Sequence, residues 1–154
     1  ENAWKSVYYL QNEVAFGELV RGMHHWGASL VIVMMFLHTL RVFFTGSYKK
    51  PRELNWIVGV GIFGVMMGLG FTGYLLPWDM KALFATKVGI EIAASVPFIG
   101  EYIKILLAGD STILGAQTLT RFFAIHVFFL PAALFALLAA HFIMIRRQGI
   151  SGPL

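Results

Sequence analysis

Three stretches of the sequence lack Asp, Glu, Lys and Arg, and each is long enough to cross a lipid bilayer. They cover residues 22–40, 54–78 and 122–145, and a transmembrane α-helix needs about 20 such residues. Only 13% of the 154 residues are charged, whereas about 25% is usual in a soluble domain. The sequence therefore predicts an all-α protein built on three transmembrane helices.

The segment between the last two stretches, residues 79–121, is more polar and is interrupted by Pro97, Gly100 and Gly109. Proline and glycine end helices and form turns. We expect an excursion outside the membrane with one or two short amphipathic helices. Because Glu1 is not a start methionine and no signal peptide follows it, the chain is expected to be part of a longer protein.

The distribution of charge predicts which side each loop faces. Residues 41–53 and the pair Arg146 and Arg147 together carry six basic side chains and one acidic side chain. Cytoplasmic loops are enriched in Lys and Arg, so this side is predicted to be cytoplasmic and the excursion 79–121 to face outward. The net charge of +4 then reports topology and does not indicate a nucleic-acid partner. The chain has no cysteine, which excludes a disulfide or a thiolate metal site within it.

Four histidines in the first and third stretches have helical spacing. His24 and His38 are 14 residues apart, about 21 Å along an α-helix, and they share one face to within about 40°. His126 and His141 are 15 residues apart, about 22 Å, and agree to within about 60°. Because one crossing separates these two helices, they run in the same direction. His24 should then lie at the depth of His126, and His38 at the depth of His141.

Two stacked histidine pairs in a membrane favour two haems with bis-imidazole ligation. The macrocycle is apolar and can occupy a helix bundle, and neutral imidazole is a standard iron ligand. Zinc would need further ligands that the sequence does not offer at these depths. The alternative from the residues alone is a set of hydrogen-bonded core histidines. His25 is rotated about 140° from the face of His38, so it is expected at the periphery, near a propionate, a lipid headgroup or another subunit.

Glycines and arginines occur where a haem would need them. The second stretch contains six glycines, of which Gly59 and Gly73 are 14 residues apart, and glycine lets a flat group approach the backbone. We expect one of them beside each macrocycle, although ordinary small-residue packing is the alternative. Arg21 precedes His24 by three residues and Arg41 follows His38 by three. Both are placed to pair with propionates.

The assembled motifs resemble a known family. They are RGMHHWGAS, FLHTLRVF, KKPRELNW, GFTGYLLPWD, GAQTLTRFFAIH and HFIMIRRQGISGPL. Together they cover nearly the whole chain and resemble the cytochrome b6-type cytochrome b subunits, most closely those of the Bacillus-type menaquinol–cytochrome c reductases. The resemblance implies a transmembrane haem-binding bundle, of which three of four helices are present, in a bacterial cell membrane.

The resemblance implies roles for individual residues. His24 and His126 would ligate one b-type haem near the outer face, and His38 and His141 a second near the cytoplasm. Quinol would be oxidised at the outer face, electrons would cross the membrane to an inner quinone site, and protons would be translocated. The outer quinol pocket would be bordered by Pro77, Trp78, Thr120 and Arg121, and the inner quinone pocket by Arg146.

The resemblance also implies partners. They are a companion subunit with the remaining cytochrome b helices, a Rieske iron–sulfur protein and a c-type cytochrome or plastocyanin-like acceptor, in a homodimeric complex. An amphipathic segment and a first transmembrane helix precede the matched region in the family, and a cysteine in that helix can tether a third, c-type haem. Since part of the outer pocket belongs to the companion subunit, no complete catalytic site is expected in this chain.

Two other functions are compatible with the histidine pattern. A di-haem membrane anchor could link a dehydrogenase to the quinone pool, but the long excursion with its LLPWD motif disfavours that function. A histidine-lined proton or metal transporter would usually place carboxylates within its membrane segments, and the three stretches contain none.

Overall fold

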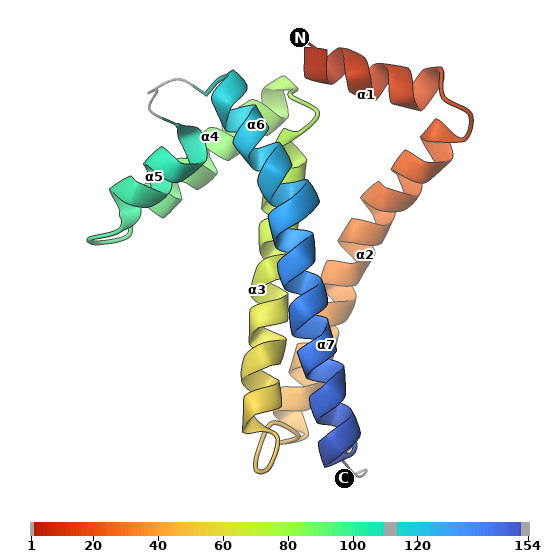
Figure 1. Cartoon of the computed structure of the whole chain (residues 1–154), viewed down its shortest axis with the longest axis vertical. Helices are drawn as coiled ribbons and strands as arrows, with labels where there is room; N and C mark the ends of the chain where they lie inside the picture. Colours follow the sequence, from red (N-terminus) through yellow and green to blue (C-terminus); the bar gives the residue numbers. More distant parts are fainter. Residues whose placement is uncertain (1, 110–113, 152–154) are drawn as a thin grey trace. The chain divides into compact units, whose positions relative to one another are not determined.

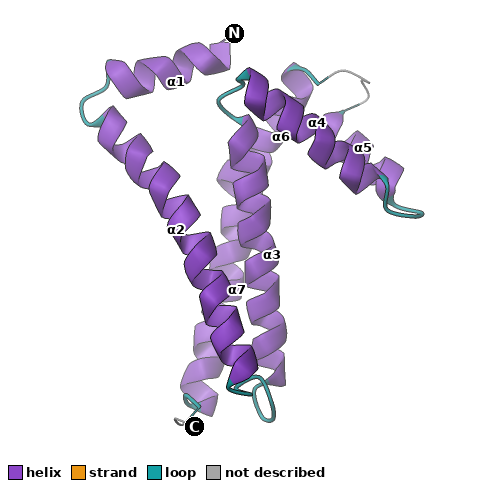
Figure 2. Cartoon of the chain, turned by 180° about the vertical axis from the view of Figure 1, so that it is seen from behind, coloured by secondary structure: helices purple, strands orange, loops and turns teal. Residues whose placement is uncertain are grey.

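Every regular element in the described residues is helical, as the sequence predicted (Figures 1 and 2). The structure is a computed structural model that describes residues 2–109 and 114–151. Residues 110–113 of the predicted excursion, Glu1 and the last three residues of the ISGPL ending lie outside the described residues. The elements in chain order are α1 (Asn2–Asn12), α2 (Gly17–Phe44), α3 (Glu53–Leu75), α4 (Met80–Ala94), α5 (Gly100–Ala108), α6 (Ala116–Ala124), a π-helical segment (Ile125–Phe129) and α7 (Leu130–Gln148).

Three of these helical runs are long and apolar enough to cross a membrane. They are Gly17–Phe44, Glu53–Leu75 and the run Ala116–Gln148, which includes the π-helical segment. They overlap the predicted stretches 22–40, 54–78 and 122–145. Helix α3 ends three residues earlier than the second stretch does, because Pro77 cannot continue a helix and Trp78 has a left-handed backbone with φ of 57°.

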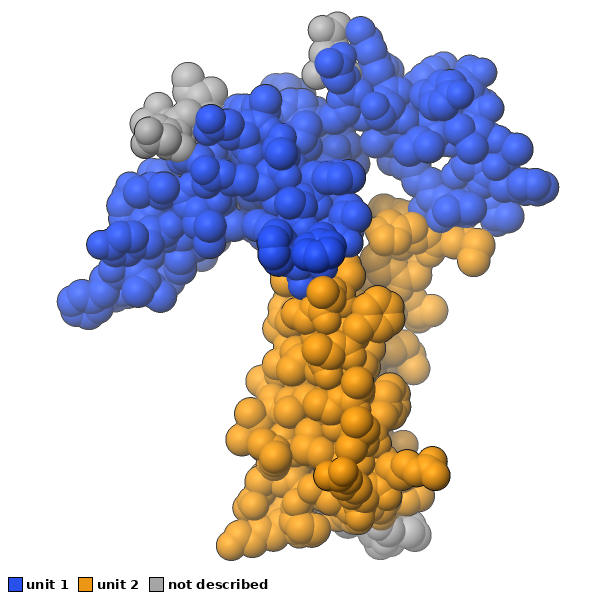
Figure 3. Space-filling model, in the orientation of Figure 1, with its two compact units in different colours: residues 1–21, 70–129 blue, residues 22–69, 130–154 orange. Residues whose placement is uncertain are grey.

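The chain divides into two compact units, which are described separately (Figure 3). Unit 1 comprises residues 1–21 and 70–129, and unit 2 comprises residues 22–69 and 130–154. Unit 1 therefore contains α1, the start of α2, the end of α3, the helices α4, α5 and α6, and the π-helical segment. Unit 2 contains most of α2 and α3 and all of α7.

The core of unit 1 lies where α4, α5 and α6 meet the end of α3. Leu75, Ala82, Ile90, Ala108 and Phe122 are buried there. Residues four apart share one face of a helix, so Ala82, Thr86 and Ile90 present one buried stripe of α4. The short helices α4 and α5 confirm the expectation of short helices within the excursion.

Helix α4 begins at a side-chain cap. Asp79 has an extended backbone, and its carboxylate accepts a hydrogen bond from the Ala82 amide at 2.7 Å. The cap satisfies one of the amides that a helix leaves free in its first turn, and the negative charge complements the helix dipole. The acidic residue of the LLPWD motif therefore fixes where α4 starts.

We expect Asp79→Ala to destabilise unit 1 by about 1 kcal/mol, because the Ala82 amide loses its acceptor. Thermal denaturation of the detergent-solubilised protein measures this change. Asp79→Asn keeps a capping oxygen and should lose much less stability. Equal losses in the two variants would show that the negative charge, not the cap, carries the effect.

In unit 2, α3 contacts α7, and hydrogen bonds join the loop between α2 and α3 to the segment after α7. A Cβ built on Gly61 of α3 would lie 3.7 Å from Leu137 of α7, which is ordinary contact. The Arg52 guanidinium, in the loop before α3, donates hydrogen bonds to two carbonyls that follow α7. They belong to Gly149, at 3.3 Å, and Ile150, at 3.2 Å. The Ser47 and Ser151 hydroxyls are 2.8 Å apart. The loop between α2 and α3 is thus bonded to the segment that follows α7.

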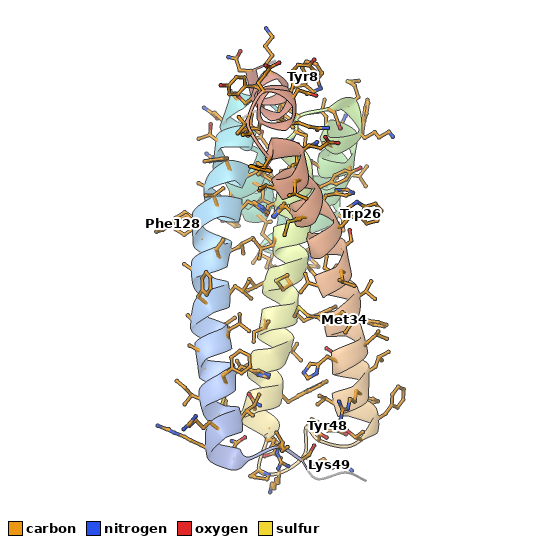
Figure 4. All side chains as sticks on the ribbon, turned by 90° about the vertical axis from the view of Figure 1, so that its right-hand side faces the viewer. Tyr8, Trp26, Met34, Tyr48, Lys49 and Phe128 are labelled. Carbon is orange, nitrogen blue, oxygen red and sulfur yellow. The ribbon has the colours of Figure 1, made fainter. Side chains whose placement is uncertain are left out.

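Large apolar side chains cover the outward surfaces of the long helices. Trp26 of α2 is 73% exposed, and Phe128 and Phe135 are also exposed. Figure 4 shows Trp26 projecting outward from α2 and Phe128 projecting outward from its own helix. A helix that is apolar all round is typical of a membrane span, so these surfaces suit lipid rather than water.

Helix α1 lies before residue 22, where the sequence predicted no helix. It is short, carries Lys5 and two asparagines, and no apolar run identifies it in the sequence. In the structure, Trp4 and Tyr8, which are four residues apart and therefore on one face of the helix, stack with ring centroids separated by 5.5 Å.

Candidate functional site

His126 lies in the π-helical segment and packs against α3 within unit 1. A Cβ built on Gly73 would be 2.5 Å from His126 Cε1 and 3.1 Å from Nδ1, closer than real side chains approach. The neighbouring Thr72 is buried, and its hydroxyl lies 3.1 Å from His126 Nδ1. The glycine thus gives the imidazole room, and the threonine engages one ring nitrogen.

His141 packs on α3 in a similar way within unit 2. A Cβ built on Gly59 would be 3.5 Å from His141 Cε1, which is normal contact. The buried Nδ1 of His141 has no hydrogen-bond partner within the described residues. His38 of α2 belongs to the same unit as His141, and the pairing of these two histidines stays a prediction.

The other two histidines of α2 lie near its beginning and are exposed. His24 belongs to unit 2 and His126 to unit 1, so their pairing stays a prediction. The His25 ring contacts Trp26 edge-on, with centroids 5.6 Å apart. This exposed aromatic pair agrees with the peripheral position expected for His25, and its role stays a prediction.

The two arginines predicted to bind propionates differ in their contacts. The Arg21 guanidinium donates a hydrogen bond to the Gln11 side-chain oxygen of α1. Arg41 is exposed in the last turn of α2, and its backbone carbonyl accepts a hydrogen bond from the Thr45 hydroxyl at 2.8 Å. Both propionate roles stay predictions.

The residues predicted to border the outer quinol pocket all lie in unit 1. Pro77 and Trp78 form the turn after α3, and Trp78 packs at the edge of the core. The Thr120 hydroxyl donates to the Ala116 carbonyl at 2.9 Å. The Arg121 guanidinium donates to the carbonyls of Ile105 and Leu106 at 2.5 and 2.7 Å, so it binds the end of α5 in this structure.

Thr118 makes a second bond from α6 to α5. Its buried hydroxyl donates to the Ala108 carbonyl at 2.8 Å and accepts from the Gly115 amide at 3.2 Å.

Arg146, predicted near the inner quinone pocket, is exposed in the last turn of α7. The quinone-pocket roles predicted for Arg146 and for the four residues of the outer pocket stay predictions.

Known proteins resemble this chain over its whole length. A family model described as cytochrome b (N-terminal)/b6/petB matches residues 29–154. The menaquinol:cytochrome c reductase cytochrome b subunit of Geobacillus thermodenitrificans is 84% identical over all 154 residues, which span 69% of that protein. The corresponding subunit of Bacillus subtilis (strain 168) is 83% identical, again across 69% of its length.

The chain belongs to the cytochrome b family. More distant members include cytochrome b6 of Heliobacterium modesticaldum, which is 48% identical over the whole chain and of which the chain covers 72%. A solved structure titled "Hyperthermophilic respiratory Complex III" matches with a TM-score of 0.88 and 32% identity. That match includes 99% of this chain but only 41% of the solved chain. Family membership and the apolar helices together make this chain an integral membrane protein.

Membership of the cytochrome b family implies bound haem b, and the described residues fit such a group. Two imidazoles, at His126 and His141, pack on glycine backbone, and at Gly73 an added Cβ would displace the His126 ring. At His126, Thr72 engages Nδ1, so Nε2 is the nitrogen that would ligate iron. A ligating histidine normally has its other nitrogen hydrogen-bonded in this way.

Sequence reasoning missed Thr72, Asn55 and Thr118. Thr72 directly precedes Gly73, and Asn55 lies one helical turn before Gly59. Polar residues beside glycines that face histidines are a detectable signal, but they gain meaning only when the packing of α3 on the histidine helix is known.

Proposed function

We propose that the chain is the di-haem b subunit of a quinol–cytochrome c reductase. His24 and His126 would ligate the outer haem, and His38 and His141 the inner haem. The proposal is carried by one observation: each histidine of the last membrane helix packs against a glycine of α3, at Gly73 and at Gly59. The names of the close relatives, which are menaquinol:cytochrome c reductase subunits, support quinol as the substrate.

In this function the chain positions, ligates and desolvates its cofactors. Haem iron supplies one-electron redox chemistry when it is bound. The histidines would hold the haem iron, the glycines would leave room for the flat macrocycle, and the apolar helices would exclude water. Ligation, packing and burial are the means by which a protein sets haem potentials. Arg21 and Arg41 would neutralise propionates at the two membrane surfaces.

The proposed topology and partners follow the charge pattern and the family. Residues 41–53 and the end of α7 would face the cytoplasm, with Arg146 near an inner quinone-reduction site. Residues 79–121 would face outward, with Pro77, Trp78, Thr120 and Arg121 beside a quinol-oxidation site. The proposed partners are a companion subunit, a Rieske protein and a c-type cytochrome or similar acceptor in a homodimer, with a third, c-type haem on a cysteine upstream of this region.

The ligand assignment is tested by His141→Leu in the assembled complex. We expect one of two b-type haems to be lost, because leucine cannot ligate iron, so the pyridine haemochrome yield per chain should fall by about half. Redox titration should show one remaining b-type transition. His25→Leu is the matched control and should retain both haems. Two unchanged transitions in His141→Leu would refute the assignment.

A further inference from the structure

Three buried side-chain polar atoms in the described residues have no hydrogen-bond partner, and all lie in unit 2. They are Asn55 Oδ1, His141 Nδ1 and Gln148 Oε1. Buried polar groups in native proteins are nearly always hydrogen-bonded, so each such atom calls for a physical explanation. Two of the three belong to residues that are neighbours across the α3–α7 packing.

Asn55 is placed near His141 by its position on α3. Gly59, which lies one turn after Asn55 on the same face of α3, packs against His141 Cε1. A carboxamide oxygen can only accept a hydrogen bond, and a protonated Nδ1 can only donate one. The two unpartnered atoms are therefore chemically complementary, and rotation about the Asn55 side-chain bonds is the adjustment that would join them.

The other histidine of this helical run already has such a partner. Thr72, also on α3, places its hydroxyl 3.1 Å from His126 Nδ1. Helix α3 thus places a glycine against each histidine, Gly73 and Gly59, and each glycine has a polar residue on the same helix, Thr72 directly before Gly73 and Asn55 one turn before Gly59. The two polar residues differ in chemistry, since a hydroxyl can donate or accept, whereas the asparagine oxygen only accepts.

We propose that Asn55 is a positioning residue for the inner haem and a determinant of its redox potential. Its side-chain oxygen accepts a hydrogen bond from His141 Nδ1 when Nε2 ligates iron. This bond orients the imidazole and increases its basicity. A more basic imidazole stabilises ferric over ferrous iron, which lowers the reduction potential. The inference rests on the proposed role of His141 as a haem ligand.

The test is a redox titration of b-type haems in the assembled complex carrying Asn55→Leu, with low-temperature EPR of the ferric haems. Loss of the acceptor should raise the potential of one haem, with about a tenfold change in its reduced-to-oxidised ratio at fixed potential. For a one-electron couple this equals about 59 mV. Asn55→Asp provides a stronger acceptor and should shift the same haem to lower potential. Thr72→Val is the matched control and should shift only the other haem.

Opposite shifts of one haem in the leucine and aspartate variants support the inference. Unchanged potentials and EPR signals in both variants, with full haem content, would overturn it and assign the bond to the Asn55 backbone carbonyl. If Asn55→Leu fails to assemble, the aspartate variant and Asn55→Thr decide by the same criteria. Loss of one haem in His141→Leu, together with unchanged potentials in the Asn55 variants, would refute this inference while leaving the ligand assignment intact.

Discussion

Gly73→Ala is expected to abolish binding of one of the two proposed haems. The added Cβ would lie 2.5 Å from His126 Cε1, so the imidazole must move. The hydrogen-bond contact between Thr72 and Nδ1 opposes that movement. A ligand displaced from its position loses iron affinity, since metal sites depend on the orientation of their ligands. The pyridine haemochrome yield per chain should therefore fall by about half.

Gly64→Ala on the same helix is the matched control. A Cβ at Gly64 would meet nothing within 4 Å, and alanine favours a helix over glycine by about 1 kcal/mol. This variant should retain full haem content and unchanged spectra. Full haem content in Gly73→Ala as well would show that His126 can shift freely and that the glycine is not needed for ligation.

Phe122→Ala is expected to give the largest loss of stability, about 3–5 kcal/mol, because it removes a fully buried aromatic ring from the unit 1 core. Phe122 has 0% exposed surface, and its ring lies 5.6 Å from that of Phe71 in α3. It also stands one helical turn before His126. Thermal denaturation in detergent should show a clearly lower Tm and an accompanying loss of haem.

Phe123→Ala tests whether this effect depends on burial. Phe123 is adjacent in sequence but 56% exposed, so truncating it leaves no internal cavity and should change the Tm little. Similar Tm losses in the two variants would mean that the Phe123 ring is buried against another subunit, and would contradict the claim that the unit 1 core carries the effect.

The sequence was sufficient to predict the long helices. Charge-free runs and 14- or 15-residue spacing depend only on bilayer thickness and helix geometry, which vary little between proteins. Gly59 and Gly73 were selected because their spacing matches that of the histidines, and each lies against a histidine ring. Local chemistry also explains why α3 ends before Pro77 and why α4 begins after Asp79.

Contacts between helices could not be predicted in the same way. The bonds from Arg121 to the end of α5 and from Thr72 to His126 join residues far apart in sequence. No periodicity identifies such pairs, because they depend on how the helices pack. The left-handed backbone of Trp78 could not be predicted either, since a bulky residue rarely adopts that conformation.

The π-helical segment around His126 bears on how this helix tolerates changes of length. A π turn forms i→i+5 hydrogen bonds, so it takes up about one residue more than an α turn for the same advance around the axis. The segment Ile125–Phe129 therefore holds about one residue more than a regular α-helix would use there, and the extra residue is accommodated within the segment that carries His126.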